Sequence, residues 1–316
     1  LWRGTELVGI WPLSLQRSAG AWIARSLDDP FGQFAGVAFA SANDIKPGIE
    51  AIVHQLKQEA LADGLQIEGL VAGSHLHAAL LRLGASINEA NHAVYVDLRA
   101  CATIKDFRQN VNAKTRKNLR NLRNRLERTH GLAEHVVEER AQVGALIDQT
   151  FAQRQRWMSR YGRTSPAFRD GDFAAVLTGL AVASGINLLG FSLTTEETIA
   201  SAQWGFVYLG RYYAYLSAKN PDYDEYSPGR MHLGMVIEAC LTRGIKFLEL
   251  MAPASNYKLD WTDRTKRLDT ASLPITLKGR IALCASAAMG APWARRLSRA
   301  LPQSARKALI RHLNKN

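Results

Sequence analysis

The spacing of hydrophobic and polar positions changes repeatedly along this chain, and each change predicts a new element. Short continuous or alternating apolar runs are typical of strands, whereas apolar residues three or four apart are typical of helices. These patterns predict strands over 7–13, 21–25, 67–71, 93–98, 136–138, 187–193, 199–208, 211–218, 245–251 and 268–277. They predict helices over 47–61, 74–83, 141–160, 168–184 and 230–243, a long helix after Thr103, and a short helix or turn at 256–261.

The stretch from 187 to 277 has the most regular pattern. Three apolar or aromatic runs joined by tight polar turns predict antiparallel hairpins. A helix follows, with Pro228 in or before its first turn and Gly244 just past its end, and further buried strands come after it. Antiparallel strands followed by a helix and more strands are typical of the α+β fold class.

Composition removes several classes of protein. With 316 residues, 47% of them hydrophobic and 22% charged, the chain can bury a large core and is not disordered. Its three cysteines stand far apart, which argues against a disulfide scaffold and a cysteine zinc site, and we expect no metal. The longest uncharged run, 173–193, contains glycines and polar residues, so a helix followed by a buried strand explains it better than a membrane span. We expect a cytoplasmic protein.

The net charge of +12 is concentrated in two segments. Residues 105–128 carry +7 and residues 279–316 carry +8, so the remainder of the chain is slightly acidic. Such local basicity favours an anionic partner. For the helix in 105–128, contact with a ligand or nucleic acid and a simple solvated face are equally good interpretations. The tail 279–316 is either a terminal helix packed on the body or a basic amphipathic helix at the inner face of the membrane.

The motif Ser227-Pro228-Gly229-Arg230 joins a strand to a helix. Serine is a good N-cap, and glycine lets a ligand approach the backbone closely. The free N–H groups of a helix N-terminus and a neighbouring arginine favour an anion. Without context, an ordinary loop-to-helix cap is the better interpretation of this motif.

Residues 211–263 resemble the BioF2-like, cellulose-biosynthesis CelD-type branch of the GNAT acyltransferase superfamily. The resemblance is carried by an aromatic strand, the Ser-Pro-Gly loop, the helix up to Gly244, a second strand and a Tyr-Lys pair, namely Tyr212 to Tyr215, Ser227 to Gly229, Phe247 to Leu250, Tyr257, Lys258 and Trp261. It extends more weakly over most of 5–277, where 116–120 looks like the family's basic helix and 9–13 like its early strand. Two features depart from the family: a single glycine stands where acetyltransferases have two or three, and residues 253–256 replace the glycine that often precedes the Tyr-Lys pair.

The resemblance implies an α+β protein with two GNAT-like lobes, each a mostly antiparallel mixed sheet flanked by helices. We expect an N-terminal lobe over 1–130, a C-terminal lobe with the acyl-donor site over 131–278, and a basic helical tail over 279–316. The implied activity is N-acyl transfer, of acetyl or a longer group, from acyl-CoA to an amine on a small molecule or glycan. The implied setting is bacterial envelope or exopolysaccharide metabolism.

Under this hypothesis the reaction needs a base, an acid and oxyanion donors. We expect Glu249 as the base, Tyr257 as the acid, and Lys258 as a contact for a phosphate or carboxylate. We expect backbone N–H groups of 213–217 to stabilise the oxyanion. The residues expected to contact the acyl donor are Tyr215, Ser227, Gly229, Arg230 and Met231. Alternatively, Glu249 pairs with Arg243 or Lys258, and Tyr257 is a core aromatic.

Two other functions remain open. The first keeps the fold but uses aminoacyl-tRNA as donor, as Fem-type transferases do, with the basic helix in 105–128 holding the RNA. The second is a non-catalytic accessory protein of polysaccharide synthesis, held at the membrane surface by the basic tail.

Overall fold

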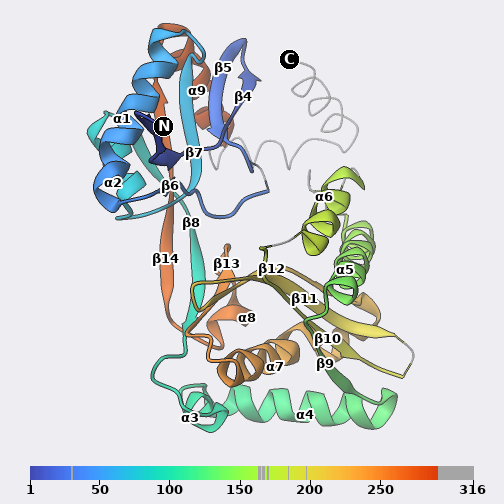
Figure 1. The fold of residues 1–316 in the computed structure, drawn as a ribbon. Coiled ribbons are helices and arrows are strands. Elements are labelled where there is room, and N and C mark those ends of the chain that lie inside the picture. The colour runs from blue at the N-terminus through green and yellow to red at the C-terminus, as the bar shows by residue number, and fades with distance from the viewer. Residues whose placement is uncertain are drawn as a thin grey trace. The chain divides into compact units, whose positions relative to one another are not determined.

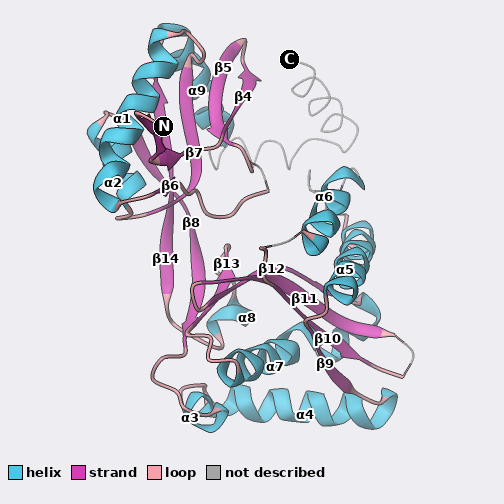
Figure 2. Cartoon of the chain, viewed as in Figure 1, coloured by secondary structure: helices cyan, strands magenta, loops and turns pink. Residues whose placement is uncertain are grey.

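The computed structural model describes residues 1–29, 31–162, 165, 168, 171–183, 185–196 and 198–290. The chain forms two compact units, the first made of Leu1–Asn91 and the residues from Arg267 on, the second of His92–Lys266. Each unit has mostly antiparallel strands with helices packed against them, which confirms the α+β prediction (Figure 2). The domain boundaries predicted at 130 and 278 remain a prediction.

The first unit has the strand order β4-β5-β7-β14, in which β5 and β7 are parallel and the other pairs antiparallel. Its core lies between these strands and two helices, α1 and α2 (Figure 1). Its elements are β1 (Trp2–Arg3), β2 (Glu6–Leu7), β3 (Gly9–Ile10), β4 (Leu13–Ser18), β5 (Ala21–Ser26), β6 (Ala38–Phe39), α1 (Ala42–Gln58), β7 (Gly64–Val71), α2 (His75–Arg82), β8 (Ser86–Asp97, shared with the second unit), β14 (Thr265–Pro274) and α9 (Leu277–Gly290).

Two predictions for the first unit need correction, and a third is partly covered by the structure. The helix expected from 47 begins earlier, at Ala42, because the Ser41 side chain accepts a hydrogen bond from the Asn43 N–H and caps it there. The strand expected over 7–13 is three short pieces, β2, β3 and the start of β4. The start of the basic tail is α9, which buries Ala282 and Leu283 against β5, while 291–316 lies outside the described residues.

The second unit has the strand order β8-β13-β12-β11-β10-β9, in which only β12 and β13 are parallel. Apart from the basic segment after Thr103, the predictions for its hairpins and helices agree with the structure to within a few residues. Its elements are α3 (Ile104–Gln109), α4 (Ala113–His130), β9 (Ala133–Val137), α5 (Arg140–Arg160), α6 (Gly171–Val182), β10 (Leu188–Thr194), β11 (Ile199–Tyr208), β12 (Arg211–Lys219), the 3₁₀ helix η2 (Pro221–Tyr226), α7 (Pro228–Thr242), β13 (Phe247–Met251) and α8 (Asn256–Leu259).

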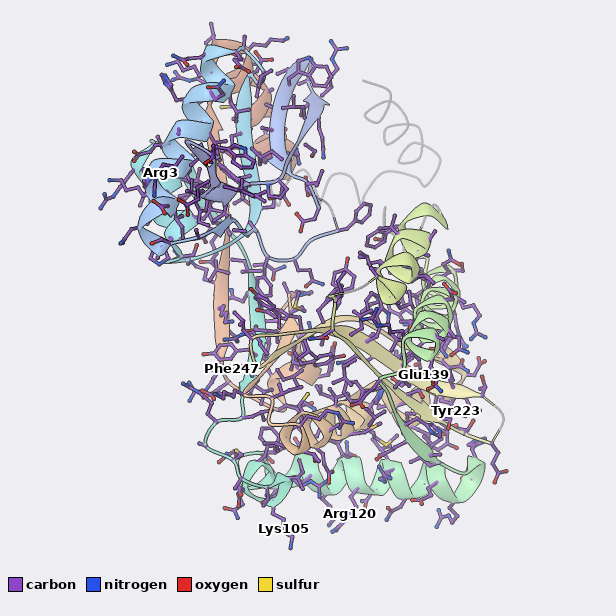
Figure 3. The ribbon with its side chains drawn as sticks, viewed as in Figure 1. Arg3, Lys105, Arg120, Glu139, Tyr223 and Phe247 are labelled. Atoms are coloured by element: carbon purple, nitrogen blue, oxygen red, sulfur yellow. The ribbon has the colours of Figure 1, made fainter. Side chains whose placement is uncertain are left out.

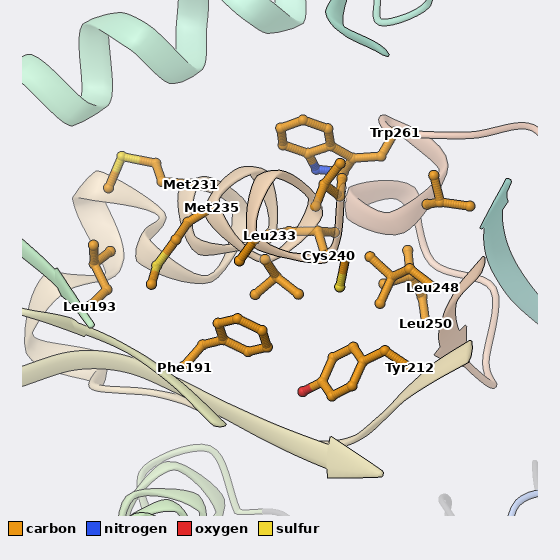
Figure 4. Packing of buried hydrophobic residues seen from close by; sticks show 14 of the residues in the cluster. Phe191, Leu193, Tyr212, Met231, Leu233, Met235, Cys240, Leu248, Leu250 and Trp261 are labelled. Carbon is orange, nitrogen blue, oxygen red and sulfur yellow. The ribbon is translucent and has the colours of Figure 1, made fainter. Parts of the chain in front are cut away.

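Helices cover both faces of the second unit's strands (Figure 1). One face carries α7, and α4 packs on α7. The core on this face contains Phe191, Tyr212 and Trp261 (Figure 4). The other face carries α5 and α6, whose core includes Phe151 and Trp204. Apolar side chains thus point to both faces of β10, β11 and β12, as a strand covered on both sides requires.

The basic segment expected to form one long helix forms two. Thr103 begins α3 with a capping box closed by Asp106, and Asn112 begins α4. The helix α4 buries Leu119 and Leu126 and exposes most of its arginines and lysines. The uncharged run 173–193 contains most of α6 and most of β10, so it is a helix followed by a strand, as expected. Among the described helices, none is both long and apolar enough to cross a membrane.

Candidate active site

The parallel strands β12 and β13 diverge soon after they meet. They pair only where Arg211, Tyr212 and Tyr213 face Phe247, Leu248 and Glu249, and β12 then continues to Lys219 without β13. Beyond Tyr213, β12 pairs with β11 on its other side alone. In β12, every second backbone N–H group after Tyr213 therefore points into the space between the diverging strands. These are the backbone groups that we expected to stabilise an oxyanion.

A bulge in the β11–β12 ladder accompanies the divergence. The register shifts between Trp204 and Phe206, so that Gly205 lies against the backbone of Tyr213. A Cβ at residue 205 would come within 1.8 Å of the Tyr213 carbonyl oxygen, so only glycine fits. Bulges bend a strand and are frequent beside active sites. Gly205 therefore holds β12 in the bent path that opens it from β13.

Tyr257, on α8, reaches the diverging part of β12. The residue is 38% exposed, while its hydroxyl lies beside the Ser217 and Ser255 hydroxyls and near the Arg154 guanidinium. Burial raises the pKa of Tyr257 above its ordinary value, and these three neighbours partly oppose that shift. The phenol is therefore protonated at neutral pH, as a proton donor must be.

Arg154, on α5, is a site residue that sequence reasoning missed. Its guanidinium lies over the Trp157 ring, 4.8 Å from the centroid, and has no carboxylate within ion-pair distance among the described residues. Its Nε is buried and has no hydrogen-bond partner in the described part of the chain. Burial lowers the pKa of Arg154, and the nearby Tyr257 opposes this. An arginine on a surface helix carries no signal in the sequence that it turns toward such a site.

Glu249 lies at the centre of a buried ion-pair cluster. The residue is fully buried, and its Oε1 accepts hydrogen bonds from Arg211 and Lys266. Its Oε2 has no partner among the described residues. These are not the partners that we expected, because Arg243 pairs instead with Glu138. A base at Glu249 remains a prediction, and the observed contacts favour the alternative of an ion-pair role.

Lys258 is buried and bonded to its own loop. Its Nζ donates to the carbonyls of Met251, at 3.1 Å, and Pro253, at 3.0 Å, and the residue is 7% exposed. Burial lowers its pKa from 10.5 to about 8. The ammonium thus holds the loop between β13 and α8, which carries Ser255 and leads into Tyr257. Its expected contact with a phosphate or carboxylate remains a prediction.

Replacing this lysine should change how stability depends on pH. Between pH 8 and 10.5 the unfolded chain binds the Lys258 proton more tightly than the folded chain, so the free energy of unfolding rises with pH there. Between pH 7.5 and 9.5 we expect the wild type to gain about 1–2 kcal/mol relative to Lys258→Met in urea unfolding. Lys57→Met, at an exposed position of α1, is the control and should show no such trend. Parallel pH profiles for the wild type and Lys258→Met would contradict the buried, weakly basic ammonium.

The loop before α7 differs in one respect from the prediction. Ser227 was expected to cap the helix with its side chain, and this is wrong: its backbone is left-handed, with φ 50° and ψ 53°, and its hydroxyl makes no capping bond. The Ser227 carbonyl instead accepts the N–H groups of Arg230 and Met231. A left-handed serine costs free energy and is a feature often found at functional loops.

The other residues expected to contact the acyl donor lie in different surroundings. Gly229 is open, since a Cβ there would meet nothing within 4 Å. Arg230 is already paired with Asp260, at 2.6 Å. Met231 is buried and faces α4, and Tyr215 packs with Trp204 and Phe206 on the α5 side of the sheet. Among the described residues, no group of three or more histidine, cysteine or acidic side chains is placed to hold a metal ion.

Comparison with known proteins agrees with this architecture. Residues 113–259 match the family model of the acetyltransferase (GNAT) domain, a range that lies inside the second unit. The match does not distinguish the BioF2-like or CelD-type branch. A comparison with curated protein sequences returned no match.

Several solved structures share the fold at low sequence identity. The C-terminal domain of a protein assigned as a lysylphosphatidylglycerol synthetase, from Agrobacterium fabrum, is 14% identical with a TM-score of 0.60, over 88% of this chain and 85% of its own. FemX is 10% identical with a TM-score of 0.57, over 85% of this chain and 86% of its own. A tandem GNAT protein from the clavulanic acid biosynthesis pathway is 12% identical with a TM-score of 0.50, over 87% of this chain and 81% of its own. Residues 113–259 are therefore similar to the acetyltransferase (GNAT) domain, within a chain whose fold is similar to that of a tandem GNAT protein.

Proposed function

We propose that this protein is an N-acyltransferase that moves an acyl group from acyl-CoA to an amine where β12 and β13 diverge. The observation that carries the proposal is the short β12–β13 pairing next to Tyr257. It leaves strand N–H groups, a protonated phenol and an arginine that has no carboxylate partner among the described residues in one place, inside the range that matches the GNAT domain model. A reaction that creates a negative oxygen and then releases a thiolate needs this combination.

The chemistry runs through a tetrahedral intermediate. The neutral amine attacks the thioester carbonyl, a C–N bond forms, and the carbonyl oxygen takes the negative charge. Strand N–H groups beyond Tyr213 stabilise that oxygen. The C–S bond then breaks, and Tyr257 donates its proton to the leaving thiolate. The proton lost by the amine passes to solvent or to Glu249, and the nearby Arg154 stabilises the phenolate until Tyr257 is protonated again.

The acyl donor would approach along the Ser227 turn toward α7. The partly exposed backbone of Gly229 can meet a phosphate, and Arg230 can contact one if its Asp260 pair opens. Met231 would support this turn through packing, whereas the ring of Tyr215 packs on the α5 side of the sheet and its contact with the donor stays a prediction. The acceptor is an amine on a small molecule or a glycan, and acyl-CoA as donor places the reaction in the cytoplasm. A role in envelope or exopolysaccharide metabolism follows only from the resemblance of 211–263.

Gly229→Ala tests where the donor binds. The substitution should leave the fold intact, because the new Cβ meets open space, but the methyl group would occupy the place of a bound phosphate. We expect CoA esters to bind about tenfold more weakly, a loss of about 1.4 kcal/mol, measured by titration calorimetry. Gly179→Ala, also in open space but on α6, is the matched control. Equal affinity in Gly229→Ala and the wild type would remove this loop from the donor site.

The activity itself is tested by thermal shift and thiol release. Acetyl-CoA, longer acyl-CoAs and free CoA are compared for their effect on the melting temperature, because a ligand that binds the native state raises it. Thiol release is then followed with a panel of amines. If no CoA ester binds and no thiol is released with any amine, the acyltransferase proposal fails, and a non-catalytic accessory role becomes the better one.

A second candidate is transfer from aminoacyl-tRNA. Two observations favour it: the Ser227 carbonyl occupies two amides of the donor loop, and α4 exposes a row of cations. Two proteins of similar fold are FemX and an assigned lysylphosphatidylglycerol synthetase. Binding of tRNA that weakens steeply with salt, without any binding of CoA esters, would favour this candidate.

A further inference from the structure

A groove on the second unit shares Met231 with the expected donor contacts but contains neither Tyr257 nor the diverging part of β12. It has a volume of about 690 Å³, within the range of small-molecule sites. One wall is α4, through Ala113, Arg116, Lys117 and Arg120, and the other is α7, through residues 231–238. On both helices the lining residues are three or four apart, so each wall is a single helical stripe.

The floor of the groove is apolar. Val111, Leu119, Met231, Met235 and Trp261 line it, and each is at least nine-tenths buried. Figure 4 shows the two methionines and the indole around α7. Trp261 comes close to α7 because residue 234 is glycine, whose Cβ would lie 2.9 Å from the ring. Methionine side chains adapt to flexible apolar ligands, so this floor suits an apolar chain.

The positive charge of the groove is confined to its middle. At one end Arg108 pairs with Glu238, and at the other Arg123 pairs with Glu134. Between these pairs Arg116, Lys117 and Arg120 have no acidic partner among the described residues. Figure 3 shows Arg120 extending from α4. Because residues 116–120 span about 6 Å of helix, the three cations can surround one compact anionic group.

We propose that this groove binds one molecule of an anionic lipid, with its phosphate at Arg116, Lys117 and Arg120 and its acyl chain over Met231, Met235 and Trp261. A compact charge next to an apolar floor fits a molecule with a single anionic head and an apolar tail. A polyanion such as RNA fits less well, because a phosphate chain laid along α4 would meet Glu134 and Glu238 at the two ends. The proposal does not depend on the acyl-transfer activity.

Two measurements on the full chain separate insertion into the groove from attraction to a charged surface. Cosedimentation with phosphatidylcholine vesicles, with and without phosphatidate, measures binding. Phosphatidate with brominated acyl chains quenches the fluorescence of any tryptophan that the chain touches. The difference in quenching between the wild type and Trp261→Phe isolates the signal of Trp261. We expect this difference to appear with brominated phosphatidate and to be absent with brominated phosphatidylcholine alone.

Matched variants on α4 then locate the site. The double substitution Lys117→Gln with Arg120→Gln should weaken phosphatidate-dependent binding about tenfold and remove Trp261 quenching. Lys114→Gln with Arg128→Gln removes the same charge from outside the groove and should keep the quenching at saturating lipid. Ala113→Phe fills the groove from an exposed position and should block the chain, whereas Asn118→Phe, exposed on the same helix but outside the groove, should not.

Two outcomes would overturn the proposal. If brominated phosphatidate does not quench Trp261 while vesicles still bind, the lipid contacts only the charged surface. If a short RNA duplex binds instead, with affinity lost in Lys117→Gln with Arg120→Gln and kept in the control pair, the groove belongs to a nucleic acid.

Discussion

Tyr257→Phe should lower kcat/KM for thiol release by about 100-fold or more, because it removes the proton donated to the leaving thiolate. The substitution keeps the ring and its packing, so the melting temperature and the affinity for CoA esters should change little. The effect should also depend on the leaving group. An acyl donor whose leaving group is already acidic, such as a thiophenyl ester, needs less proton donation and should lose much less rate.

Tyr208→Phe is the matched control for this experiment. Tyr208 lies at the exposed end of β11, with 65% of its surface accessible, and takes no part in the proposed chemistry. It should therefore keep wild-type turnover. If Tyr257→Phe also keeps it, Tyr257 is a packing residue, and the proton must come from elsewhere.

Glu249→Gln should lower the free energy of unfolding by about 3 kcal/mol, because breaking a buried ion pair leaves partly buried cations without their counter-charge. Both cations concerned, Arg211 and Lys266, are less than one-third exposed. Their ion pairs hold β12 and β13 together with Lys266, the last residue of the second unit, so the loss should appear in the unfolding of that unit. The measurement is urea unfolding followed by circular dichroism.

The same variant separates the two interpretations of Glu249. If Glu249 acts only as a base, Glu249→Gln should be stable but turn over slowly. If Glu249 is the centre of an ion-pair cluster, the variant should be unstable. Glu138→Gln breaks an exposed pair with Arg243 and serves as control, with an expected change below about 1 kcal/mol. Wild-type stability in Glu249→Gln, together with lost activity that returns when the pH of the assay is raised, would support the base.

The local elements of the second unit could be predicted because their causes are local. The hairpins of β10, β11 and β12 follow from alternating residues and from turns at their ends, and α7 ends at Gly244 in a left-handed conformation as expected. The strand β8 was predicted only from 93 on, because its first half carries exposed polar residues and has little apolar pattern. Its pairing with other strands, rather than its hydrophobicity, extends it back to Ser86.

The candidate site shows the same division between local and long-range causes. Tyr257 and the Ser227 turn could be identified from the sequence because the resemblance fell on contiguous residues. Arg154 could not, because it lies about a hundred residues away, on a helix whose packing against β12 brings it to Tyr257. The partners of Glu249 could not be identified from the sequence either, because Arg211 comes from a strand earlier in the chain and Lys266 from a later one.

The amino-acid pattern was thus enough to determine the fold class, most of the helices and strands of the second unit, and the positive charge of α3 and α4, because each depends on neighbours along the chain. It did not determine where β12 leaves β13, which cations meet Glu249, or that three basic residues lie over an apolar floor. Those features arise from contacts between residues far apart in sequence, and folding decides them by burying apolar surface and pairing buried polar groups.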